Sequence, residues 1–376
     1  MNNLPPGIRH HSSRGGYEIR IRFKDPFTGE SKRASAYAKS LVEAKRKQRE
    51  MMFRIDNHQS PVDATMNFGK LVEHWLDREL PHQGLKPNTQ DLYSGLARKH
   101  ILGSNLERLK VSSVTPSHLD EFFRNLEGSA GQSLRRNLYS ALSHIFCLAL
   151  RNALIAKSPL ELVRRPAQKK QEVRFLSQDE LTHLMRELEG SRYWKVARLI
   201  LLTGIRRGEA LGLSWADVDF EQSQIHIRHT LDSKGRRGAP KTARSIRTLE
   251  LHKPAVDLLK EVRKTQIQNR LKLGNLFEGC SWDPVFTTDD GKATQPRVFL
   301  RAIQAAAERS GLNPPGTVEK VGVHTLRHFV ASQLLSNGVD MMIVSRILGH
   351  ESIKTTVDIY GHMHDSLRKQ ALSSLA

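Results

Sequence analysis

Cysteine is almost missing from this 376-residue chain. Cys147 and Cys280 are the only two, far apart, so they form neither a disulfide framework nor the paired spacing of a zinc site. No His-Glu-x-x-His motif supplies zinc ligands either. Cys147 lies within the apolar run 145–150 and is expected in a core. We therefore expect no fold stabilised by disulfide bonds, no metal site and no cofactor.

Long apolar runs are also missing. No stretch reaches the roughly 18 apolar residues that a membrane-spanning helix needs. The polar N-terminus has no signal-peptide core. We therefore expect a soluble, intracellular protein without a membrane partner.

Acidic residues are too few to balance the basic ones. Lys and Arg number 59 against 39 Asp and Glu, which gives a formal net charge of +20. A charge of this size favours a polyanionic partner, although a solvated basic surface is the simpler alternative. The basic residues recur beside strand and helix patterns instead of gathering in one tail, which favours nucleic-acid binding by folded domains.

Residues 1–60 form the first predicted domain, and 13 Lys and Arg against 6 Asp and Glu make it basic. Residues 17–24 alternate between apolar and mostly cationic side chains, as a strand with one buried face does. Residues 31–38 can return as a second strand, and Ser40 with Glu43 reads as a capping box for a helix to about Ile55. Such a sheet could lie in a DNA groove, or serve only as a stabilising hairpin.

Residues 65–162 are predicted to be helical throughout. Apolar residues recur at helical spacing in two stripes, and Thr115-Pro116 is typical of an N-cap followed by proline at the first helical position. The stripes are Phe68, Leu71, Val72, Trp75 and Leu76, then Leu138, Leu142, Ile145, Phe146 and Leu150. A basic, proline-containing linker follows at 163–171.

Residues 175–376 mix helices with one hairpin. Ser177 and Glu180 form a capping box, and residues 224–230 and 245–251 read as two strands joined by a basic loop. The predicted fold class is α+β and multidomain: a small N-terminal β-sheet plus helix, an all-α bundle, and a mostly helical domain with a small antiparallel sheet.

This last domain contains residues suited to metal-free phosphoryl transfer. Cleaving a phosphodiester requires a nucleophile, cations that offset charge on the non-bridging oxygens, and an acid for the leaving 5′ oxygen. Guanidinium groups fit two phosphate oxygens at once, and a phenol near cations can attack phosphorus. The candidates are Arg206, Lys241, His324, Arg327, His350 and Tyr360.

In their order and wording, the segments around these residues resemble the tyrosine recombinases, specifically the phage integrase branch. The resemblance runs from about Phe175 to the C-terminus and includes Thr203-Gly204-Ile205-Arg206, His324-x-x-Arg327, Leu348-Gly349-His350 and the segment around Tyr360. His328, His362 and His364 lie nearby but outside the family's motif positions.

The resemblance implies a role for each candidate. Tyr360 is the nucleophile, Arg206 and Arg327 hold the phosphate, and Lys241 is the general acid. His324 could accept the tyrosine proton or bind a phosphate oxygen, His350 is a further donor, and Glu209 could orient Arg206. Arg207 competes with Arg206 for its role, and Lys234 competes with Lys241.

The resemblance also implies a site-specific recombinase that cuts and rejoins DNA through a 3′-phosphotyrosine, without ATP or metal, to integrate and perhaps excise phage or mobile-element DNA. Residues 1–60 would bind arm sites, 65–162 core sites, and 175–376 would be catalytic. The expected partners are double-stranded DNA, a homotetramer on DNA, a DNA-bending host factor and a directionality factor, in the bacterial host cytoplasm. A type IB topoisomerase and a non-catalytic DNA-binding regulator are the alternatives.

Overall fold

The computed structural model describes residues 4–11, 15–24, 31–56, 66–128, 131–167, 173–240, 245–317 and 319–361. The chain divides into two compact units, residues 1–170 and 171–376. Lys241, His362 and His364 lie outside the described residues. Within the described ranges, no helix combines the length and apolar character needed to cross a bilayer.

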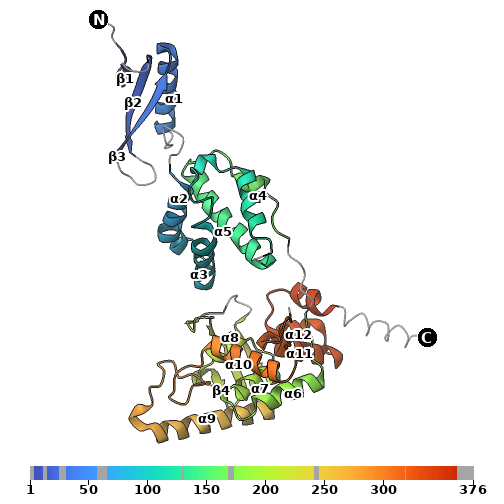
Figure 1. The fold of residues 1–376 in the computed structure, drawn as a ribbon. Helices are drawn as coiled ribbons and strands as arrows, with labels where there is room; N and C mark the ends of the chain where they lie inside the picture. The colour runs from blue at the N-terminus through green and yellow to red at the C-terminus, as the bar shows by residue number, and fades with distance from the viewer. Residues whose placement is uncertain are drawn as a thin grey trace, which may run out of the picture. The chain divides into compact units, whose positions relative to one another are not determined.

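The N-terminal unit begins with a three-stranded antiparallel sheet and one helix beside it (Figure 1). The elements are β1 (Ile8–His10), β2 (Tyr17–Lys24), β3 (Ser31–Ala38) and α1 (Leu41–Asp56), in sheet order β1-β2-β3. The two predicted strands and the helix are confirmed. Ile19 is buried under α1, whereas Arg20 and Arg22 are exposed, as the alternation predicted. β1 was not predicted, because three residues are too few to show alternation.

The described residues of the segment 65–162 are mainly helical, as predicted. The helices are α2 (Phe68–His74), α3 (Pro87–Leu96), α4 (Pro116–Asn125) and α5 (Gln132–Arg151), with π-helical turns at Trp75–Glu79 and Ala97–Ile101. Thr115 caps α4 as predicted, since its side chain accepts a hydrogen bond from the backbone N–H of His118 at 3.4 Å.

The placement of Cys147 in a core was wrong. Its neighbours Ile145 and Phe146 are buried on the inner face of α5, but Cys147 is exposed. In a helix, a residue two positions from an inward-facing one points in nearly the opposite direction, so the apolar run of α5 extends around to the outer face.

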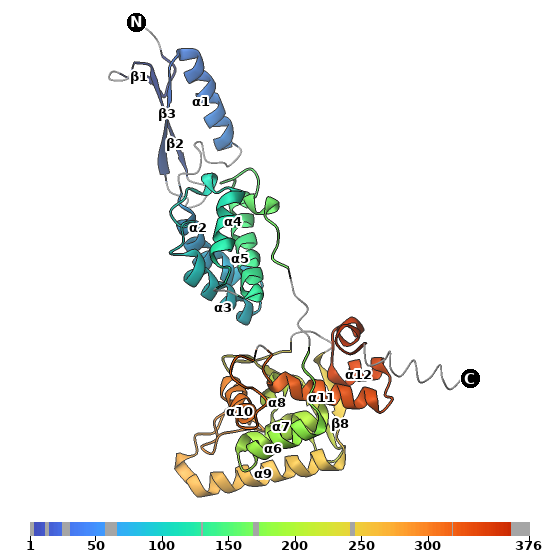
Figure 2. The ribbon, with the colours of Figure 1, turned by 45° about the vertical axis from the view of Figure 1, so that its right-hand side comes forward.

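The C-terminal unit is mostly helical, with two small sheets (Figure 2). Its helices are α6 (Gln178–Leu188), α7 (Arg192–Thr203), α8 (Arg207–Gly212), α9 (Lys253–Leu273), α10 (Pro296–Arg309), α11 (Val323–Ser336) and α12 (Met341–Leu348). The strands are β4 (Val218–Asp219), β5 (Gln224–Ile227), β6 (Thr230–Leu231), β7 (Arg237–Gly238) and β8 (Arg247–Glu250), in the orders β4-β5-β8 and β6-β7. Residues 353–361 are helical again. The predicted pairing of the two strand segments is confirmed in β5 and β8, and Ser177 with Glu180 caps α6.

Two glycines bring the hairpin β6-β7 against α8. A Cβ atom at Gly208 would lie 2.4 Å from Oγ1 of Thr230, and one at Gly212 would lie 2.8 Å from Cα of Thr230. Only residues without a side chain permit so close an approach. The hairpin is therefore held beside α8, the helix whose N-cap is Arg206.

Candidate active site

Arg206 lies at the N-terminus of α8, where a sharp turn separates α8 from α7. Gly204 ends α7 in the left-handed region, with φ of +68°. Glu209, one turn into α8, accepts hydrogen bonds from the Arg206 backbone N–H at 3.0 Å and from its Nη1 at 2.7 Å. The contact that the sequence predicted between Glu209 and Arg206 is therefore present.

Glu209 is an ionised carboxylate in a buried position. Its side chain is 2% exposed, and Oε2 also accepts a hydrogen bond from Nη2 of Arg247 at 3.0 Å. Burial by itself would raise the pKa of Glu209, but Arg247 and Arg206 outweigh burial, so the pKa is lowered. A buried charge is stable when it is paired and hydrogen-bonded in this way.

Arg327 faces the same region from α11 and is 5% exposed. Its Nη1 donates to the carbonyl of Gly204 at 2.7 Å, and its Nη2 donates to the carbonyl of Leu348 at 2.6 Å. Burial and the nearby Arg206 lower the pKa of Arg327 to about 9, so the guanidinium remains charged at neutral pH. Arg206 donates to the next carbonyl, that of Gly349, at 2.5 Å. Two arginines 121 positions apart thus meet at the end of α12.

The two predicted histidines differ in their surroundings. Nδ1 of His350 lies 2.8 Å from Oγ1 of the fully buried Thr356. Burial and the charges of Arg327 and Arg206 lower the pKa of His350 to about 4, so its ring is neutral at pH 7. His324 has an exposed edge, and partial burial together with Arg327, Arg207 and Arg206 lowers its pKa as well.

Tyr360 is 1% exposed and hydrogen-bonded to a histidine that the sequence motifs had not singled out. Its hydroxyl lies 2.6 Å from Nδ1 of His328, and its ring centroid lies 5.9 Å from that of Phe175. Burial raises the pKa of the phenol and lowers that of His328 to about 4. The phenol of Tyr360 therefore stays protonated and hydrogen-bonded to a neutral His328, in the core shared by α11 and α12. No motif position pointed to His328, since only the folded chain brings it to Tyr360.

The segment predicted to carry the general acid is only partly described. Lys241 lies outside the described residues, but both ends of its loop are placed. Pro240 is buried, and Ser245 is buried with its hydroxyl 3.5 Å from Nη1 of Arg206. The rival Lys234 is exposed in the turn between β6 and β7. The loop thus ends beside Arg206.

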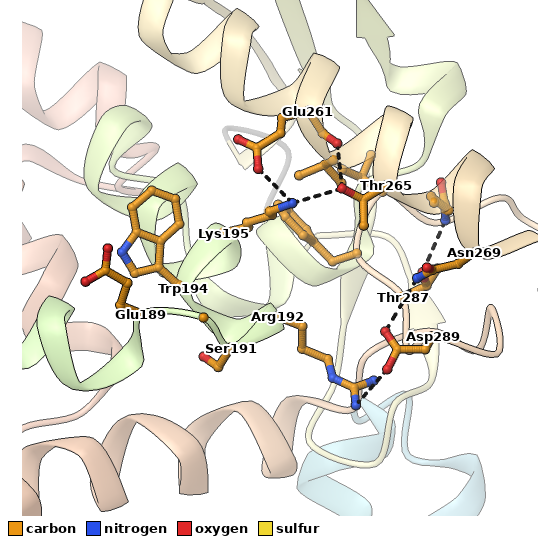
Figure 3. A pocket seen from close by; sticks show the side chains of 15 residues that line it. Glu189, Ser191, Arg192, Trp194, Lys195, Glu261, Thr265, Asn269, Thr287 and Asp289 are labelled. Carbon is orange, nitrogen blue, oxygen red and sulfur yellow. Dashed lines mark hydrogen bonds and ion pairs between the residues drawn. The ribbon is translucent and has the colours of Figure 1, made fainter. Parts of the chain in front are cut away.

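A separate pocket of about 400 Å³ lies between the start of α7 and α9, away from these residues (Figure 3). Two ion pairs lie in its lining: Lys195 with Glu261 at 3.0 Å, and Arg192 with Asp289 at 3.6 Å. None of the seven predicted site residues lines it. In the described parts of the chain, no three His, Cys, Asp or Glu side chains gather to hold a metal ion.

Comparison with known proteins gives a consistent result. Residues 174–366 match the model of the "Phage integrase family". A "Tyrosine recombinase XerC-like" protein of Caldanaerobacter subterraneus is 28% identical over 96% of this chain and 95% of that protein. The "ICEBs1 integrase" of Bacillus subtilis is 26% identical over 96% and 97%. The XerC tyrosine recombinase of Chlorobaculum parvum is 30% identical over 79% and 92%.

The fold resembles solved structures as well. The Tn1549 transposon integrase in complex with circular intermediate DNA aligns with a TM-score of 0.65 at 19% identity, covering 83% of this chain and all of that one. A lambda integrase dimer bound to a core site aligns with a TM-score of 0.60 at 18% identity, covering 96% and 95%. The chain belongs to the phage integrase family and is a tyrosine-type site-specific recombinase.

Proposed function

We propose that this recombinase cuts DNA by attack of Tyr360 on a phosphate held by Arg206 and Arg327. The observation that supports this proposal is the meeting of the two guanidinium groups at consecutive carbonyls, Leu348 and Gly349, at the start of the segment that leads to Tyr360. Each planar fork can direct two N–H groups to phosphate oxygens.

The proposed cleavage step moves the DNA phosphate from the 5′ oxygen to Tyr360. The Tyr360 oxygen bonds to phosphorus, the bond from phosphorus to the 5′ oxygen breaks, and Lys241 gives its proton to that oxygen. The phenolic proton passes to His324 or to solvent, and His350 offers a further hydrogen bond. The resulting 3′-phosphotyrosine retains the bond energy, so a 5′ hydroxyl of a second duplex can reverse the step and join new strands without ATP.

We assign DNA contacts to the other two parts of the chain. The exposed cations Arg20, Arg22 and Lys24 lie on one side of β2, which suits arm-site DNA for residues 1–60. Residues 65–162 would bind core sites through their polar faces, and 175–376 would be the catalytic domain. Footprinting with residues 1–60 and 65–376 tests this division: two separate footprints are expected, and a single shared footprint would contradict it.

The partners of the reaction follow from the same proposal. Two duplex sites exchanged in two rounds require four active subunits, so we propose a homotetramer on DNA. An integrase with separate arm sites would work with a DNA-bending host factor and a directionality factor, in the bacterial cytoplasm where its DNA is found.

The reaction is tested with full-length protein and a supercoiled plasmid that carries both attachment sites, with EDTA present. We expect recombinant circles from the wild type and none from Tyr360→Phe. Relaxation of the plasmid without recombinants would instead indicate a topoisomerase.

A further inference from the structure

Arg247, at the start of β8, donates a hydrogen bond from each of its three guanidinium nitrogens to a group within the site. Nη2 binds Glu209 at 3.0 Å, Nε donates to the carbonyl of Ile347 at 3.0 Å, and Nη1 donates to the carbonyl of Ser245 at 3.0 Å. Its side chain is 10% exposed. All three nitrogens of this guanidinium are thus directed at acceptors inside the protein.

A second observation, at Gly349, shows how closely Arg247 is fitted. A Cβ atom at Gly349 would lie 2.7 Å from Nη1 of Arg247, and Gly349 has a φ of +66°. The guanidinium therefore covers the face of the residue whose carbonyl binds Arg206. Any side chain at position 349 would push Arg247 away.

Three consecutive carbonyls at the end of α12 thus bind three different arginines. Ile347 accepts from Arg247, Leu348 from Arg327 and Gly349 from Arg206. The last carbonyls of a helix lack partners within the helix and carry its negative dipole end, so cations are stabilised there. The arginines come from β8, α11 and the start of α8.

We propose that Arg247 is a positioning residue for the cleavage reaction: it fixes the Glu209 carboxylate that orients Arg206, and it fastens β8 to the end of α12. This proposal rests on the function proposed above. β8 begins just beyond the loop that contains Lys241. One guanidinium therefore connects this loop, the arginines proposed to hold the phosphate, and the segment that leads to Tyr360.

The consequence of losing Arg247 follows from the charges. Glu209 is buried and now has two cations beside it. Without Arg247, Arg206 alone offsets the carboxylate and is drawn toward it, away from the phosphate. The cleavage step should suffer, and DNA affinity, which depends on many basic contacts, should change little.

The test measures single-turnover formation of the covalent adduct on a nicked core site, and binding to the same DNA, with full-length protein. We expect Arg247→Gln to cleave about 10–100-fold more slowly, which is the cost of losing a group that orients the ligands of a metal site. Its Kd for DNA should stay within about threefold of the wild type. Arg247→Lys keeps a charge beside Glu209 and should cleave faster than Arg247→Gln. Arg309→Gln on α10, which removes an exposed ion pair with Glu187 on α6, is the control and should cleave like the wild type.

A double-mutant cycle with Glu209→Gln separates positioning from general structural support. If Arg247 acts through Glu209, the double variant cleaves within about threefold of the slower single variant. The inference would be overturned if the rate losses of the two single variants multiplied in the double variant, or if Arg247→Gln cleaved like the wild type. If Arg247→Gln does not fold, the same cycle is run with Arg247→Lys. A wild-type protein that forms no adduct would refute the proposed function itself, before Arg247 is considered.

Discussion

The hydroxyl of Tyr360 bonds to Nδ1 of His328 at 2.6 Å, and this bond holds the proposed nucleophile away from solvent. Tyr360 is 1% exposed, and burial raises the pKa of its phenol. His328 is the residue directly after Arg327 on α11. One helix turn therefore holds an arginine proposed to bind the phosphate and the histidine that binds the proposed nucleophile. In this arrangement Tyr360 must break its bond to His328 before it can attack a phosphate.

Replacing His328 by Ala should release Tyr360. Loss of a bond worth about 1.4 kcal/mol would raise the population of exposed Tyr360 about tenfold. Nitration by tetranitromethane in the absence of DNA, followed by peptide mapping, measures this population. Tyr360 should be protected in the wild type and modified faster in His328→Ala. Equal rates in the two proteins would show that His328 does not hold Tyr360.

Acid should destabilise the C-terminal unit between about pH 6.5 and pH 4. The pKa values of His328 and His350 are lowered to about 4, so between this value and the unfolded value near 6.5 the unfolded chain binds more protons than the folded one. Stability is fully present above pH 6.5 and falls as pH decreases through this window, by on the order of 3 kcal/mol per histidine. Thermal unfolding at pH 7 and pH 4.5 measures the loss. The double variant His328→Asn/His350→Asn should lose less; an equal loss would place the titrating groups elsewhere.

Arg206→Lys should slow cleavage strongly, although the charge is kept. A lysine cannot bind Glu209, the carbonyl of Gly349 and a phosphate at once, so adduct formation should slow by about 10²–10³-fold. Arg207→Lys is the matched neighbour, because Arg207 makes no hydrogen bond to Glu209 or Gly349 among the described contacts. If Arg207→Lys cleaves more slowly than Arg206→Lys, then Arg207 and not Arg206 binds the phosphate.

The general acid can be identified by changing the leaving group of the DNA substrate. Lys241→Ala should slow cleavage of ordinary DNA by about 10²–10⁴-fold, because the departing 5′ oxygen lacks a proton donor. A substrate with sulfur in place of that oxygen leaves without protonation, so the variant should cleave it at nearly the wild-type rate. Lys234→Ala should behave like the wild type on both substrates. Rescue of Lys234→Ala instead would assign the acid to the β6-β7 turn.

Local signals in the sequence predicted much of the fold. The alternation in 17–24 predicted the first strand, and 31–38 was predicted to return as the second. Thr115 and Ser177 marked helix starts through hydrogen bonds within four residues. Such signals depend on neighbours along the chain, so they can be read from one sequence.

Long-range contacts could not be predicted in the same way. Arg247 lies 38 positions from Glu209 and 100 from Ile347, and His328 lies 32 positions from Tyr360. Nothing in the sequence next to either residue differs from an ordinary strand arginine or helix histidine. The prediction that Cys147 lies in a core was wrong for a related reason. An apolar run in a helix does not show which of its sides the core covers.

The most direct measurement is the identity of the residue that becomes linked to DNA. Full-length protein is incubated with a nicked core site, the adduct is digested with trypsin, and the nucleotide-bearing peptide is sequenced by mass spectrometry. The nucleotide should be attached through its 3′ phosphate to Tyr360, and Tyr360→Phe should bind the same DNA without forming the adduct. Attachment at another residue, or an adduct that persists in Tyr360→Phe, would contradict the proposed mechanism.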